Sequence, residues 1–230
     1  MTAPRDRSRR RRGELSVREQ IVALCRQMNA AGLNQGTSGN ISVRFREDML
    51  ITPSGLPYEA MGPDDIACMP VAGDTLEWAG PHRPSSEWHF HRAILRTRPE
   101  FGAVVHTHST FATTLAIGGE SIPPCHYMVA AFGGRDVRCA RYATFGTDAL
   151  SEQVLIAMRE RSACLLANHG MVAAGADLER AMWSAVELET LARQYYYAKL
   201  ADKVVLLADD EIDRVIEKFK GYGPKSNTDR

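Results

Sequence analysis

The stretch Ala103-Val104-Val105-His106-Thr107-His108 joins a short apolar, β-branched run to two histidines. Such a run is typical of a buried strand, because β-branched side chains pack well on a pleated surface. Alternate side chains of a strand lie on the same face, so His106 and His108 are expected to point the same way. The strand therefore ends in two imidazoles, which are common ligands of Zn²⁺.

A third histidine lies about sixty residues further along, in Asn168-His169-Gly170 between two short apolar runs. Three imidazoles suit a catalytic Zn²⁺ that keeps one coordination position open. The adjacent glycine lets another segment of backbone approach closely. His106, His108 and His169 are therefore predicted metal ligands, although a histidine in a protein core is also commonly a hydrogen-bonded structural group.

Glu87 follows Ser85-Ser86 at the predicted start of a helix. Its carboxylate is a candidate for a displaceable fourth metal ligand or for a base. A second interpretation stays open, because an acid in the first turn of a helix also stabilises the helix dipole. Glu87 and His91 are four residues apart, so they also fit an ordinary pair on one helix face.

The remaining sequence alternates helices with short strands. Its apolar patterns predict helices at about residues 14–32, 86–98, 110–117, 149–161, 178–199 and 209–220, and strands at residues 40–46, 49–52, 66–71, 103–107, 164–167 and 171–174. Ser85 or Ser86 is expected to cap the second helix and Asp177 the fifth. This alternation predicts one three-layer α/β/α domain around a central mixed, largely antiparallel sheet.

Charge is balanced overall but not along the chain. There are 28 basic and 28 acidic residues, and residues 1–12 hold six arginines and one aspartate, so a local charge of +5 leaves about −5 for the rest. Short blocks of like charge are commonly solvated, so residues 1–13 are predicted to form a disordered leader with no nucleic-acid partner. No apolar run approaches the ~18 residues of a membrane span, so no membrane partner is expected.

A chain of 230 residues with 44% hydrophobic content suits one domain with a proper core. We place this domain at residues 14–223, followed by a flexible tail at residues 224–230. The five cysteines are odd in number, and none forms a C-x-x-C pair. Reduced thiols are therefore expected, as in a cytoplasmic protein.

Three loops rich in glycine and small hydroxyl side chains lie at residues 36–40, 52–55 and 85–86. Hydroxyls and unhindered backbone N–H groups form nests for phosphate, and the third loop also opens a helix N-terminus. No Gly-Lys-Ser/Thr follows, so this is not a Walker A loop. Each loop also fits an ordinary turn or cap, which leaves the anion site a hypothesis on these residues alone.

Together these motifs resemble the class II aldolase/adducin family and, within it, the zinc-dependent L-fuculose-1-phosphate aldolases. The resemblance runs from Arg18 to Gly223, and several motifs in the right order are highly specific for the family. The matching segments are Leu33–Arg44, Ile51–Gly55, Pro84–Trp88, His106–His108, His126–Met128, Tyr142–Thr147 and His169–Gly170. The arginine-rich leader lies outside the resemblance.

The resemblance implies a role for each candidate residue. The ligands of one Zn²⁺ per subunit would be His106, His108, His169 and, in the empty enzyme, Glu87. The residues that would cradle a substrate phosphate are Thr37, Gly39, Asn40, Ser54, Gly55, Ser85 and Ser86. Tyr127 would reach the active site of a neighbouring subunit in a homo-oligomer, typically a C4 tetramer. Phe145 and Tyr222 would lie near the aldehyde end of the substrate.

The implied activity is that of an aldehyde-lyase, which reversibly cleaves a ketose 1-phosphate to dihydroxyacetone phosphate and an aldehyde. The metal would stabilise the charge on the ketone half as a Lewis acid. Glu87 would move the proton on carbon, and Tyr127 would exchange a proton with the hydroxyl that becomes the aldehyde. The substrate stays open between L-fuculose 1-phosphate, 5-deoxyribulose 1-phosphate and 5-methylthioribulose 1-phosphate.

Three alternatives within the resemblance are weighed against the aldolase. A pentulose-phosphate 4-epimerase would carry an aspartate in the position of Glu87. A methylthioribulose-phosphate dehydratase would lack the Ser-Ser-Glu-Trp pattern. A non-catalytic adducin-like assembly module would have lost histidines or Glu87, whereas all of them are present.

Overall fold

A computed structural model describes residues 4–73 and 77–221, with the backbone alone for residues 4–10. Its centre is a seven-stranded sheet of order β3-β2-β1-β4-β7-β6-β5. The strands are β1 (Asn40–Phe45), β2 (Asp48–Ile51), β3 (Ala67–Pro70), β4 (Ala103–Thr107), β5 (Cys139–Ala140), β6 (Ala163–Leu166) and β7 (Gly170–Gly175). All neighbouring pairs are antiparallel except β5 and β6, which are parallel.

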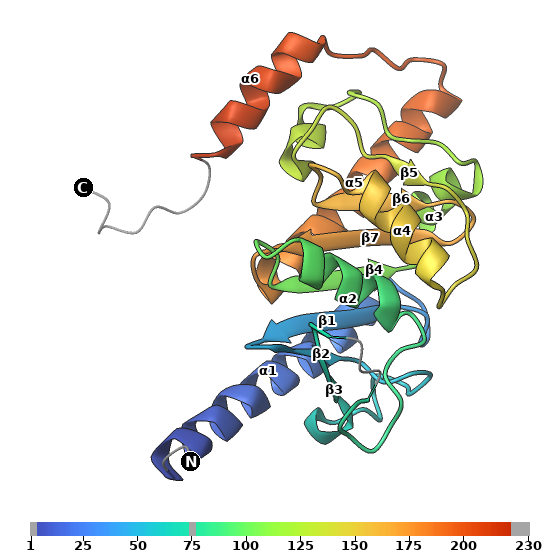
Figure 1. Cartoon of the computed structure of the whole chain (residues 1–230). Coiled ribbons are helices and arrows are strands. Elements are labelled where there is room, and N and C mark those ends of the chain that lie inside the picture. The colour runs from blue at the N-terminus through green and yellow to red at the C-terminus, as the bar shows by residue number, and fades with distance from the viewer. Residues whose placement is uncertain (1–3, 74–76, 222–230) are drawn as a thin grey trace.

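Helices cover both faces of this sheet, as Figure 1 shows. One face packs against α1 (Pro4–Ala30), α3 (Thr110–Ile117) and α5 (Leu178–Leu200), and the other against α2 (Trp88–Thr97) and α4 (Asp148–Ala157). Each face has its own apolar core, which confirms the predicted three-layer α/β/α domain with a mixed, largely antiparallel sheet.

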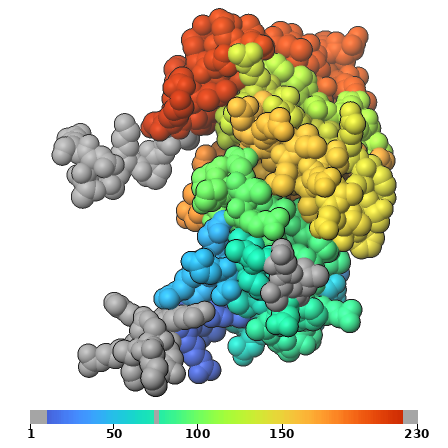
Figure 2. Space-filling model, viewed as in Figure 1, coloured from blue at the N-terminus to red at the C-terminus, as the bar shows by residue number. Residues whose placement is uncertain are grey.

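Beyond the layers, α6 (Asp209–Phe219) packs against the 3₁₀ helix η2 (Tyr127–Phe132), and a second 3₁₀ helix, η1 (Pro63–Asp65), precedes β3. Ile212 of α6 is fully buried, and Arg135 forms ion pairs with Asp209 and Asp213. The space-filling view in Figure 2 shows α6 at the opposite end of the molecule from α1. Among the described residues, no helix is both long and apolar enough to cross a membrane.

Alternation along the strands gives the two faces different chemistry at one end of the sheet. Ile41 and Val43 of β1 pack in the core beneath α1, which leaves Asn40 and Ser42 on the face toward α2. On β4, Val105 packs in the core beneath α1, whereas Val104 packs in the core beneath α2. His106 lies on the same face as Val104 and therefore also faces α2. A group of buried polar side chains is thereby collected beneath the first turn of α2.

Most predicted elements, α2 included, are confirmed within a residue or two, but α4 ends at Ala157 rather than near residue 161, and the N-cap residue of α2 is not the predicted one. Glu87 itself is the N-cap residue and its side chain makes no capping hydrogen bond, while the hydroxyl of Ser85 accepts a hydrogen bond from the backbone N–H of Glu87 at 3.3 Å. The backbone N–H of Ser85 is bound to the carbonyl of Thr52, which holds this segment against the neighbouring loop. Tertiary pairing therefore sets where the helix begins.

The arginine-rich leader also differs from the prediction. Residues 4–13 belong to α1 rather than to a disordered segment. Arginine is a good helix former, and a helix already anchored through the buried Ile21, Cys25 and Met28 extends more easily than an isolated one forms. The predicted tail at residues 224–230 lies outside the described residues, as does Tyr222.

Candidate metal centre and active site

Strand register brings the candidate ligands together at one end of the sheet. Asn40 of β1 is paired with His106 of β4, and the last residue of β4, Thr107, is paired with Met171 of β7. The turn between β6 and β7 therefore lies beside the end of β4 and carries His169 to it. His108, one residue beyond β4, completes the group.

Gly170 is required for this close approach. A Cβ atom at this position would lie 2.5 Å from the carbonyl oxygen of Thr107 and 2.9 Å from Cδ2 of His108. Both distances are too short for any side chain. The expectation that a glycine lets the backbone approach closely beside the third histidine is therefore confirmed, and the neighbour is the strand end that carries the other two.

The ligand atoms of Glu87, His106, His108 and His169 all lie within 4.8 Å of one another. Nε2 of His106 lies 3.1 Å from Nε2 of His108 and 3.1 Å from Oε2 of Glu87, and Nε2 of His169 lies 3.0 Å from Oε1 of Glu87. Ligands at about 2.0–2.1 Å from a tetrahedral Zn²⁺ are separated by about 3.3 Å, close to these values. The donor set and its spacing fit a metal ion.

Protonation favours the same conclusion. Nδ1 of His106 lies 2.8 Å from the carbonyl of Met171 and can only donate to it, so in a neutral ring Nε2 is the nitrogen that can bind a metal. Burial and the nearby His106 and His169 lower the pKa of His108 to about 4, so its ring is neutral at pH 7. Burial acts to raise the pKa of Glu87, but His106 and His169 outweigh it and hold this pKa well below its usual value.

The segment that carries His108 is held from two sides. The carboxylate of Glu189 on α5 accepts hydrogen bonds from the backbone N–H groups of Phe111 and Ala112, both at 2.8 Å, and so caps α3 from a distance. On the other side, the backbone N–H of His108 donates to Oδ1 of Asn34 at 3.4 Å. Neither partner is recognisable from sequence spacing, because both contacts are long-range.

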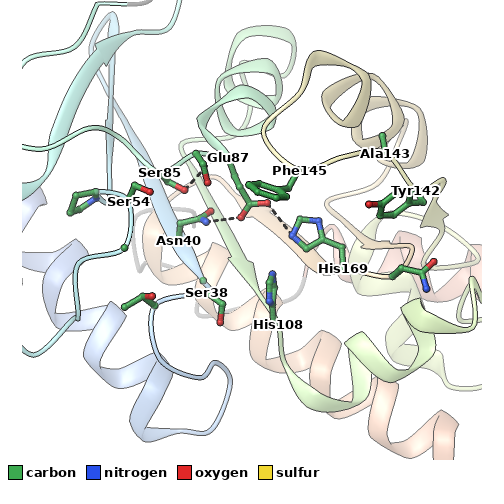
Figure 3. A pocket seen from close by; sticks show the side chains of 16 residues that line it. Ser38, Asn40, Ser54, Ser85, Glu87, His108, Tyr142, Ala143, Phe145 and His169 are labelled. Carbon is green, nitrogen blue, oxygen red and sulfur yellow. Dashed lines mark hydrogen bonds and ion pairs between the residues drawn. The ribbon is translucent and has the colours of Figure 1, made fainter.

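A pocket of about 350 Å³ opens above this cluster, and Figure 3 shows Glu87 and His169 at its centre. All seven residues predicted to cradle a phosphate line it, together with Glu87, His108, His169 and Phe145. The lining residues that we did not assign to the site are Ser38, Pro53, Tyr142, Ala143 and Asn168. Four of them lie within segments that carried the family resemblance, and Asn168 directly precedes such a segment, so the segments were recognised but these side chains were not.

Small residues dominate the side of the pocket opposite His169. Gly39 admits no side chain, since a Cβ there would lie 2.9 Å from the carbonyl oxygen of His106. Gly55 adopts a positive φ of 69°, which bends the loop that carries Ser54. Among the described residues, those that line the pocket include no lysine or arginine, so hydroxyl, amide and backbone N–H groups and the start of α2 are available to an anion.

Two aromatic residues lie at the mouth of the pocket, and a third lies away from it. Tyr142 and Phe145 line the pocket, and each exposes 63% of its surface. Tyr127 begins η2, is half exposed and does not line the pocket of its own chain. The roles predicted for Tyr127 and Phe145 stay predictions.

The chain is similar to proteins of one family along most of its length. Residues 19–196 match the family model for the Class II Aldolase and Adducin N-terminal domain. The chain is 50% identical to a Rhodospirillum rubrum protein named 5-methylthioribulose-1-phosphate/5-deoxyribulose-1-phosphate aldolase, over 91% of this chain and 93% of that one. It is 48% identical to an Escherichia coli L-fuculose phosphate aldolase, over 89% and 94%. A solved L-fuculose 1-phosphate aldolase superposes with a TM-score of 0.84 at 39% identity, over 89% and 96%.

Proposed function

The chain belongs to the class II aldolase and adducin N-terminal domain family, and we propose that it is a zinc-dependent aldolase. It would reversibly cleave a ketose 1-phosphate to dihydroxyacetone phosphate and an aldehyde. The observation that carries this proposal is the convergence of three imidazole nitrogens and one carboxylate beneath a pocket lined by hydroxyl and backbone N–H groups. A non-catalytic module would have no need of this arrangement.

His106, His108, His169 and Glu87 would hold the metal, one ion per subunit. Three imidazoles with a carboxylate form a donor set that zinc favours, which supports this ion over magnesium or calcium. When bound, the ion would supply Lewis-acid polarisation of the ketone end of the substrate.

The side chains and backbone of the protein would bind the phosphate and transfer the proton. The loops at residues 37–40 and 54–55 and the start of α2 would bind the phosphate through N–H and hydroxyl groups and so fix the ketone half. Glu87, ionised and 5% exposed, would take and return the proton on the carbon next to the carbonyl. Burial of this carboxylate keeps water from competing for that proton.

The substrate proposal follows the relatives. Those named above act on 5-methylthioribulose 1-phosphate, 5-deoxyribulose 1-phosphate or L-fuculose phosphate, and these sugars differ at the aldehyde half. The direct test measures dihydroxyacetone phosphate release from each of the three ketose 1-phosphates, before and after EDTA treatment and zinc restoration. Release from none of them, or release that EDTA does not affect, would refute a metal-dependent aldolase.

We further propose that Tyr127 acts in the site of a neighbouring subunit of a C4 tetramer. Its half-exposed ring, away from the pocket of its own chain, supports this role. In mixed oligomers of Glu87→Gln and Tyr127→Phe subunits, about one quarter of the sites would regain both native groups if the two come from adjacent subunits of a ring. Mixed samples no more active than the two parents would contradict this assembly.

The proposed location is the cytoplasm. Cys25, Cys125, Cys139 and Cys164 carry free thiols, as expected in a reducing compartment. Cell fractionation with antibody detection tests this directly.

A further inference from the structure

A buried chain of hydrogen bonds runs from the active-site carboxylate back into the protein. Asn40 donates from Nδ2 to Oε2 of Glu87 at 2.9 Å, and Oδ1 of Asn40 contacts Nε2 of His91. Nδ1 of His91 in turn lies 2.7 Å from the hydroxyl of Ser42. His91 and Ser42 are fully buried, so solvent offers these two groups no alternative partner, and Asn40 is 4% exposed at the floor of the pocket.

The periodicities of a strand and of a helix bring these hydrogen-bonded residues together. Asn40 and Ser42 are alternate residues of β1 and share the face toward α2, while Glu87 and His91 are one helical turn apart. The sequence left open a direct pair between Glu87 and His91. Instead, the imidazole spans Asn40 and Ser42 across the interface between helix and strand.

The direction of every bond follows from the carboxylate. An ionised carboxylate only accepts hydrogen bonds, so Asn40 must turn its NH₂ group toward Glu87. The amide oxygen then faces His91 and requires a donor, which places the ring proton on Nε2. A neutral imidazole has one donor, so Nδ1 accepts and Ser42 donates. Burial lowers the pKa of His91 to about 3, which keeps the ring neutral at pH 7.

We propose that His91 is a positioning residue for the carboxylate of Glu87. The two ends of an asparagine amide are nearly equal in shape, and the reversed amide would set its oxygen against that of Glu87. With the ring proton on Nε2, His91 binds the amide oxygen and so favours the orientation that turns the NH₂ group of Asn40 toward Glu87. His91 does not line the pocket and acts through Asn40 alone. The inference rests on the proposed aldolase function, in which Glu87 is the acid–base group.

Three variants of α2 separate positioning from packing. His91→Leu removes both ring nitrogens, whereas His91→Gln retains an N–H donor that can reach Asn40. His89→Leu is the matched control, because it makes the same change on the same helix. The ring of His89 stacks on Trp88 at 3.8 Å and does not line the pocket.

With zinc-loaded protein and a ketose 1-phosphate that the wild type cleaves, His91→Leu should lower kcat about 10–100-fold, the range for residues that orient a metal-site group. Its KM should stay within about threefold, since the phosphate loops are intact. His91→Gln should recover most of the rate, and His89→Leu should match the wild type. Ser42→Ala should cost less than about threefold alone and nothing further in His91→Leu, where the chain is already broken.

Co²⁺ in place of zinc gives a readout independent of turnover. The visible absorption of Co²⁺ depends on the ligand arrangement, so it should change in His91→Leu and return in His91→Gln. Unchanged kcat and spectrum in His91→Leu would overturn the proposal. It would also be overturned if His91→Gln lost as much kcat as His91→Leu and both variants had a lower melting temperature, because the loss would then reflect stability. If the wild type releases dihydroxyacetone phosphate from no ketose 1-phosphate, the aldolase function fails, while the Co²⁺ spectra still decide the role of His91.

Discussion

The floor and the mouth of the pocket are built in opposite ways. At the floor, His106 is fully buried and Glu87 is 5% exposed, and strand register and hydrogen bonds fix both. At the mouth, Tyr142 and Phe145 each expose 63% of their surface. The side chains of the floor are enclosed by their own chain, whereas the mouth exposes apolar surface.

This difference follows from the elements that carry each region. The floor is formed at the ends of the central strands β1 and β4, by the β6–β7 turn and by the start of α2. The mouth belongs to residues 141–147, a segment without regular structure before α4. Rigid strands suit chemistry that tolerates little displacement, while loops can vary without disturbing the sheet. The proposed reaction would thus be common to relatives, and the preferred aldehyde would differ.

Of the variants that distinguish the floor from the mouth, Glu87→Gln at the floor is expected to change activity the most. Glutamine has nearly the same shape but does not accept a proton, so turnover should fall by about 10²–10⁴-fold, the usual range for loss of an acid–base group. Fold and zinc content should stay largely intact. Release of dihydroxyacetone phosphate, zinc content and circular dichroism measure these three properties. Near-normal turnover would refute the acid–base role.

His108→Ala should weaken metal binding by more than about 100-fold, because even partners outside the ligand shell change affinity about 10–100-fold. Zinc content after dialysis and titration with a competing chelator measure the loss. Tyr142→Phe at the mouth is the control, and its zinc content should be normal. An unchanged zinc content in His108→Ala would count against His108 as a ligand.

Gly170→Ala tests whether the floor depends on close approach of the backbone. The added Cβ would meet the carbonyl of Thr107 at 2.5 Å, so the β6–β7 turn must shift. A loss of about 1–3 kcal/mol in the free energy of unfolding is expected from such overpacking, together with weaker zinc binding. Urea denaturation measures the first effect. Wild-type stability would show that the turn is more adaptable than the structure indicates.

Phe145→Ala should have the smallest effect on activity, and this effect should be confined to the mouth of the pocket. Loss of apolar contact with the aldehyde half should change the ratio of kcat/KM between two ketose 1-phosphates by about tenfold, within the usual range for an apolar pocket. Zinc content should not change. A uniform loss across all substrates would instead assign Phe145 to the shared half of the site.

Local sequence predicted the elements well because their signals are local. β4 has the predicted bounds, and Asp177 caps α5 through a hydrogen bond from the backbone N–H of Arg180 at 2.7 Å. Apolar periodicity and capping residues act over one or two turns, so they are legible without knowledge of the fold. The N-cap residue of α2 differs from the prediction, and the backbone of Ser85 is instead paired with Thr52, a contact between distant segments that no local capping signal contains.

The sequence by itself determined the layered fold and the chemical types gathered in the site: three histidines, a carboxylate and loops of small residues. Only the tertiary structure decided which groups meet. Register set Asn40 opposite His106, and packing of α2 on β1 made His91, rather than His89, the partner of Asn40. Both histidines lie in the same helical turn and look alike in sequence. Their different roles depend on which face of the helix meets the sheet, and that is fixed by burial of the whole apolar surface rather than by any neighbouring residue.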